Sequence, residues 1–151
     1  MRRKDKEMTD PDAVASVIRR STVCRLGMSD DNQPYVVPMS FGYKDGAVYF
    51  HCATEGRKIE ILRKNPRVCI EFDVDCRLKT GDSACKWGFI FQSVIAFGVA
   101  SFIEGSMEKR AALDIIMRQY SSDAFTYPES ALEKILVIKV NITELTGKAA
   151  F

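Results

Sequence analysis

The segment at residues 89–103, FIFQSVIAFGVASFI, constrains the fold more than any other part of the chain. It is rich in Val, Ile and Phe, which are enriched in strands, and it is too long for one flat strand in a small sheet. Gly98 interrupts it, and a bend or bulge at this glycine would let one strand serve both sides of a barrel. The segment therefore predicts a strongly curved sheet.

Most of the remaining chain also has strand character. Strands are predicted at residues 22–28, 35–43, 47–52, 67–74 and 136–140, with a further stretch at 143–148 that finishes the chain. Lys44-Asp45-Gly46 predicts a hairpin turn with the favoured Asp-Gly pair. Helices are predicted at residues 9–20, 57–64 and 107–120. Six strands, a few peripheral helices and no βαβ pattern predict an α+β, mainly β fold, a six-stranded antiparallel barrel.

Length and composition set the frame for partners and location. A chain of 151 residues suits one domain, 1–151, in which residues 1–8 are expected to form a flexible basic tail. A net charge of +2 and no basic stripe beyond this tail argue against a nucleic-acid partner. The five cysteines contain no C-x-x-C pair, and no apolar run resembles a signal peptide or a membrane span. We therefore expect a cytoplasmic protein with reduced thiols and no membrane partner.

Common catalytic motifs are missing from the sequence. His51 is the only histidine, and no G-x-S-x-G turn presents a serine for a hydrolase. The cysteines are too widely spaced for a zinc site, so no metal is predicted. Neither a Walker A loop nor a G-x-G-x-x-G turn occurs. With so few side chains suited to chemistry, any catalysis is expected to belong to a bound cofactor.

The segment at residues 50–66, FHCATEGRKIEILRKNP, suggests where such a cofactor would bind. It predicts a strand end, a turn at Gly56 and a helix whose first turn carries Arg57 and Lys58. Cations at a helix N-terminus are electrostatically misplaced unless an anion docks on the free N–H groups there. The alternative is a solvated helix in which Glu60 pairs with Arg57 at i,i+3. The residues alone leave both interpretations open.

These segments, taken in order, resemble the FMN-binding split-barrel family of pyridoxamine 5′-phosphate oxidase, and most of all its nitroimidazole-resistance (Nim) branch. The matching pieces cover about residues 1–148, and the GRK…NPRV block is the most specific of them. They are CRLGM at 24–28, YVVPMSFGY at 35–43, YFHCATEGRKIEILRKNPRVCIEF at 49–72, ACKW at 84–87, QSVIAFGVA at 92–100 and TGK at 146–148. The resemblance implies a six-stranded split barrel that binds FMN.

The resemblance also implies a role for particular residues. Arg57 and Lys58 would grip the FMN phosphate. The second strand would run along the isoalloxazine ring, mostly through backbone contacts, and His51 and Cys52 would face the ribityl chain and the phosphate. A polar residue of the long strand would lie beside the ring. The complete set of implied cofactor-binding residues is Val37, Pro38, Met39, Ser40, His51, Cys52, Arg57, Lys58 and Ser93.

The assembly and the activity are expected from the same resemblance. Family members are typically homodimers with flavin at the interface, to which Trp87 or the 125–127 loop of a partner would contribute. The leading function is an FMN-dependent oxidoreductase that acts on a small molecule such as a nitroimidazole or another nitro-aromatic compound, with His51 as a candidate catalytic proton donor. One alternative is a haem-binding or haem-degrading protein with His51 as axial ligand. Another is a flavin-binding module without turnover.

Overall fold

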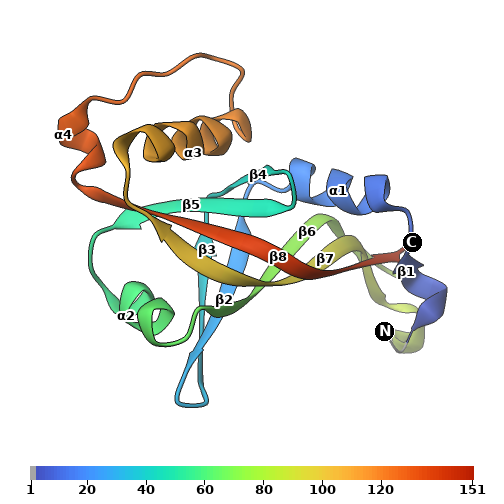
Figure 1. Cartoon of the computed structure of the whole chain (residues 1–151). Helices are drawn as coiled ribbons and strands as arrows, with labels where there is room; N and C mark the ends of the chain where they lie inside the picture. The colour runs from blue at the N-terminus through green and yellow to red at the C-terminus, as the bar shows by residue number, and fades with distance from the viewer. Residues whose placement is uncertain (1–2) are drawn as a thin grey trace.

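The computed structural model of the chain, which describes residues 3–151, is built around one antiparallel sheet. The sheet has eight strands in the order β3-β2-β6-β7-β8-β5-β4, and β1 pairs with β8 outside this path (Figure 1). The strands are β1 Glu7–Met8, β2 Cys24–Asp30, β3 Gln33–Met39, β4 Gly42–Lys44, β5 Ala47–Ala53, β6 Arg67–Lys79, β7 Gly88–Ile103 and β8 Ile135–Ala150. The predicted α+β, mainly β split barrel is confirmed.

The helices lie at the periphery of this sheet. They are the 3-10 helices η1 Lys4–Lys6 and η2 Ala84–Lys86 and the α-helices α1 Pro11–Arg20, α2 Arg57–Lys64, α3 Ser106–Arg118 and α4 Glu129–Leu132. Figure 1 shows α3 and α4 together on one side of β5 and β8, and α2 on the other side. Within residues 3–151, the helices are all too short or too polar to cross a membrane.

The strand count differs from the six predicted because of tertiary contacts. The expected strand at 35–43 is broken between β3 and β4, where Phe41 is fully buried and Gly42 lies against α3. A Cβ atom at Gly42 would lie 2.6 Å from the backbone of Ile115. The two stretches expected at 136–140 and 143–148 form one continuous strand, β8. Local sequence cannot report such packing between distant segments.

The N-terminal segment is also more ordered than predicted. Glu7 and Met8 form β1 and pair with Lys148 and Gly147 of β8. The approach is close, because a Cβ atom at Gly147 would lie 3.0 Å from the Cβ of Met8. The prediction of a flexible tail over residues 1–8 is therefore wrong for Glu7 and Met8. Residues 1–2 lie outside the described residues.

The turn and bulge glycines behave as the sequence predicted. Asp45 and Gly46 have φ angles of 50° and 72°, as a two-residue type I′ hairpin turn requires between β4 and β5. The pairing of β7 with β8 shifts register between Phe97 and Gly98. Phe97 pairs with Glu144 and Gly98 with Ile142, so Thr143 of β8 is the extra residue of a β-bulge, and the sheet bends where Gly98 lies opposite it.

Gly98 gives a stability prediction. A Cβ atom there would lie 2.5 Å from the carbonyl oxygen of Asn141 and 2.6 Å from Cγ1 of Val140. We expect Gly98→Ala to lower the free energy of unfolding by about 1–3 kcal/mol, because the bulge must open to admit the methyl group. Urea denaturation measures this. Gly88→Ala is the control, since a Cβ at Gly88 meets no atom of residues 3–151 within 4 Å. Equal stability of the two variants would contradict the prediction.

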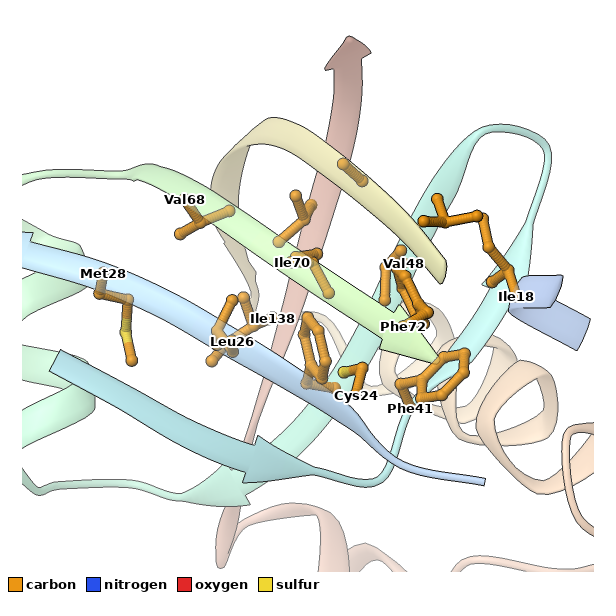
Figure 2. Close-up of a cluster of buried hydrophobic side chains, with 14 of the residues drawn as sticks. Ile18, Cys24, Leu26, Met28, Phe41, Val48, Val68, Ile70, Phe72 and Ile138 are labelled. Carbon is orange, nitrogen blue, oxygen red and sulfur yellow. The ribbon is translucent and has the colours of Figure 1, made fainter. Parts of the chain in front are cut away.

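Side chains fill the interior of the barrel. Figure 2 shows Leu26, Ile70 and Phe72 among the buried side chains between the strands. Phe41 packs edge-to-face on Phe72, with ring centroids 5.0 Å apart. Phe41 therefore belongs to the core. Because the interior is filled, a ligand as large as a nucleotide has to bind at an edge or on the surface of the barrel.

Candidate functional site

The N-terminus of α2 is free to bind an anion. Gly56 precedes the helix with a φ of 127°, a conformation that suits glycine, and its carbonyl accepts from the N–H groups of Ile59 and Glu60. Among residues 3–151, no side chain caps this helix and no ion pair involves Arg57, Lys58 or Glu60. The structure thus contradicts the alternative in which Glu60 neutralises Arg57. It leaves two cations beside uncapped N–H groups.

Both cations reach across to β3. The Arg57 guanidinium lies 4.7 Å from the centroid of the Tyr35 ring, which is a cation–π contact. The Lys58 ammonium lies 3.2 Å from Sδ of Met39. Tyr35 and Met39 lie four residues apart on one face of β3, as the two-residue period of a strand requires. Sequence reasoning missed Tyr35, although this spacing could have revealed it.

Cys52 adds a third element to the same region. It lies on β5, half-buried against the core. Burial raises the pKa of the Cys52 thiol, and the positive charge of Lys58 opposes that rise. The region formed by Tyr35, Met39, Cys52, Arg57 and Lys58, from β3, β5 and α2, is called the α2 site below.

The free edge of β3 borders the α2 site. β3 is the last strand of the sheet order and, within residues 3–151, pairs only with β2. Its two prolines, Pro34 and Pro38, lie four residues apart, so their backbone nitrogens point to the same edge of the strand. A proline nitrogen has no hydrogen to donate, and in strands it faces away from the neighbouring strand. The backbone groups of Val36 therefore also point to the open edge. This edge offers peptide groups that no strand of the described chain uses.

The other predicted residues of the second strand are divided between two faces. The side chains of Val37 and Met39 pack against the core, whereas Pro38 and Ser40 are exposed. Such alternation leaves mainly the backbone for contact with a ligand at the edge. The arrangement agrees with the backbone role that the family resemblance implies for this strand.

His51 and Ser93 are not brought to the α2 site within one chain. His51 is exposed and pairs with Val137, and alternation along β5 turns its side chain to the face opposite Cys52. Ser93 lies in β7 between Asp73 and Lys148, on the outer face of the sheet, because its neighbour Val94 is fully buried inside. The two-residue strand period could have shown that His51 and Cys52 cannot face one ligand together.

An apolar groove lies on this outer face. The register aligns Val36, Gly27, Cys69 and Phe97 across β3, β2, β6 and β7. Val36 is 60% exposed and Phe97 44% exposed. The groove has a volume of about 360 Å³, and Val36 connects it to the free edge of β3.

Comparison with known proteins places this chain in a family. Residues 10–149 match the family model described as pyridoxamine 5′-phosphate oxidase. A solved structure from Bacteroides thetaiotaomicron, described as a candidate 5-nitroimidazole antibiotic resistance protein, is 39% identical, with a TM-score of 0.85, over 94% of this chain and 85% of that one. No curated protein matches the sequence.

More distant structures share the fold alone. The flavocytochrome Anf3 from Azotobacter vinelandii has a TM-score of 0.87 at 20% identity, covering 100% of this chain and 72% of that one. An FAD and haem binding protein from Mycobacterium smegmatis has a TM-score of 0.86 at 16% identity, covering 96% and 73%. The family model and the 39% identical structure confirm the resemblance seen in the sequence. The chain belongs to the pyridoxamine 5′-phosphate oxidase-like family of split-barrel proteins.

Proposed function

We propose that the protein is an FMN-dependent oxidoreductase whose cofactor binds at the α2 site and along the free edge of β3. One observation carries this proposal: two cations, Arg57 and Lys58, lie beside an uncapped helix N-terminus without a carboxylate partner among residues 3–151. A phosphate dianion satisfies the N–H groups and both cations at once. The donor set therefore fits the phosphate end of FMN.

The remaining contacts suit the rest of the cofactor. Of the predicted residues Val37, Pro38, Met39 and Ser40, alternation leaves the carbonyl oxygen of Pro38 and the backbone of Ser40 at the open edge for the polar rim of a ring, whereas Val37 and Met39 turn their backbone groups to β2. Cys52 lies beside the phosphate end. When bound, FMN would supply the electron transfer. The protein would bind it, orient it and shield it from water, and His51 stays a candidate proton donor on the opposite face of β5.

A nitro-aromatic substrate is the class we favour. The similarity at 39% identity to a candidate 5-nitroimidazole antibiotic resistance protein supports it.

The five cysteines, all free, are compatible with a cytoplasmic location.

Spectroscopy and a single-turnover measurement test this function. The purified protein, reconstituted with FMN, should show flavin absorbance bands, and the chemically reduced holoprotein should be re-oxidised without oxygen by a 5-nitroimidazole. Flavin bands without re-oxidation would indicate a binding module. A Soret band in place of flavin bands would favour the haem alternative with His51 as ligand.

We expect Cys52 to pack beside the cofactor without taking part in electron transfer. Burial raises the pKa of its thiol, so little thiolate exists at neutral pH despite the nearby Lys58. Cys52→Ser should keep flavin re-oxidation within about twofold of the parent rate, since no reactive thiolate is lost. Alkylation of the holoprotein, followed by mass spectrometry, should be slow at Cys52 and fast at the exposed Cys85. Loss of turnover with flavin still bound would instead make Cys52 a catalytic residue.

We also propose a homodimer with the cofactor between subunits. The α2 site is open to solvent on one chain, and Arg57 is exposed. The apolar groove beside the β3 edge gives a second copy a surface to cover. A partner on this face would also approach Ser93, whose side chain does not face the α2 site of its own chain.

A further inference from the structure

The C-terminal end of α3 is bonded to the segment that follows β3. The Tyr120 hydroxyl accepts the backbone N–H of Phe41 at 2.8 Å and donates to the carbonyl oxygen of Thr22 at 3.1 Å. Phe41 lies between β3 and β4, and Thr22 lies just before β2. One hydroxyl thus joins the end of β3 to the start of its pairing strand.

A second contact fixes the residue on the other side of Ser40. The thiol of Cys24 lies 3.6 Å from the carbonyl oxygen of Met39. Cys24 is fully buried, and burial raises the pKa of its thiol to about 12, so it remains a protonated donor. Ser40, which is exposed, therefore lies between two residues whose backbone groups are both bonded to side chains.

Packing restricts the same bend further. A Cβ atom at Gly42 would lie 2.6 Å from the carbonyl carbon and oxygen of Ile115 in α3. Side-chain displacement cannot relieve a contact with helix backbone. The helix and the bend therefore fit together in one arrangement, and the tyrosine at the end of the helix sets the direction of the Phe41 N–H group.

We propose that Tyr120 is a positioning residue for the cofactor: through Phe41 it fixes the backbone of Met39 and Ser40 at the end of the β3 edge. This inference rests on the proposed function, in which that backbone contacts the flavin. Met39 is also the residue that Lys58 touches. A shift at the bend would thus disturb the edge and the α2 site together.

The neighbouring residue in the sequence offers a matched control. The Gln119 side-chain amide donates to the carbonyl oxygens of Ile18, Arg19 and Ser21, at 3.2, 2.9 and 2.9 Å. These bonds attach the same end of α3 to the end of α1 and do not touch the β3 bend. Gln119→Met should therefore loosen the helix end without altering the bend, whereas Tyr120→Phe removes only the hydroxyl from it.

The experiment compares the two variants with the parent in three measurements. In the absence of cofactor, hydrogen exchange of the peptide covering residues 39–44 should be faster in Tyr120→Phe and unchanged in Gln119→Met. FMN should bind Tyr120→Phe about three- to tenfold more weakly, as the loss of one neutral hydrogen bond predicts. The visible circular dichroism of bound FMN should change in Tyr120→Phe alone, because a general loss of stability would not re-orient the ring.

Two results would overturn the inference alone. One is a Tyr120→Phe variant whose FMN affinity and visible circular dichroism equal those of the parent. The other is a Gln119→Met variant that loses as much FMN affinity as Tyr120→Phe. A parent protein that binds no FMN would overturn the proposed function and the inference with it. The outcomes thus distinguish a failure of the inference from a failure of the proposed function.

Discussion

Replacing Arg57 or Lys58 by alanine is expected to weaken FMN binding about ten- to a hundredfold, which corresponds to the 1.5–3 kcal/mol typical of a hydrogen bond to a charged group. The physical reason is that each residue supplies a cation to the same phosphate, at a helix end that has no other cap among residues 3–151. The double variant should bind more weakly than either single variant. Titration of the cofactor-free protein, followed by flavin fluorescence, measures these affinities.

Riboflavin separates a phosphate contact from a contact with the ring. It lacks the phosphate, so the parent should bind it far more weakly than FMN, and the double variant should bind the two flavins alike. Arg63→Ala is the matched control, because Arg63 is a cation of the same helix in its last turn. If both single variants bind FMN as tightly as the parent, or if the parent binds riboflavin as tightly as FMN, the phosphate assignment fails.

The sequence predicted the parts of the fold that depend on local chemistry. The helix at residues 57–64 has the predicted bounds, because Gly56 precedes it and Asn65-Pro66 follows it. The Asp-Gly hairpin also follows from the backbone conformations that glycine and aspartate allow, since Asp45 and Gly46 both have positive φ angles. Each of these features depends on a few neighbouring residues.

Features that depend on distant residues could not be predicted in the same way. The break between β3 and β4 exists because α3 packs on Gly42 and Tyr120 accepts the N–H of Phe41. No residue near Phe41 in the sequence indicates that its N–H group binds the side chain of Tyr120, which lies much later in the chain. The pairing of β1 with β8 likewise depends on the small size of Gly147.

The candidate site was predicted in part. The phosphate end was predicted from Arg57 and Lys58, and the structure brings both to β3. Tyr35, the cation–π partner of Arg57, was missed because aromatic residues in strands are so often core residues. His51 and Ser93 were predicted from the resemblance, and their side chains lie on other faces of the same chain. In the proposed dimer Ser93 would face the partner subunit, because the outer face of β7 borders the groove that a second copy would cover.

The proposed dimer predicts a loss of both assembly and cofactor when Phe97 becomes aspartate. Phe97 is in register with Cys69 and Gly27 in the groove, and a carboxylate there would have to lose its hydration when the interface forms. The parent should sediment at about twice the chain mass of 17.0 kDa at low micromolar concentration. Phe97→Asp should sediment as the single chain.

FMN binding should fall with the dimer, because the open α2 site would lose the partner that covers it. Met107→Asp is the control, since Met107 is 80% exposed on α3, away from the groove, and this variant should remain a dimer with bound flavin. Circular dichroism in the far ultraviolet verifies that Phe97→Asp is folded. A folded Phe97→Asp monomer that keeps one FMN per chain would show that one subunit suffices for the site, and Ser93 would then have no part in it.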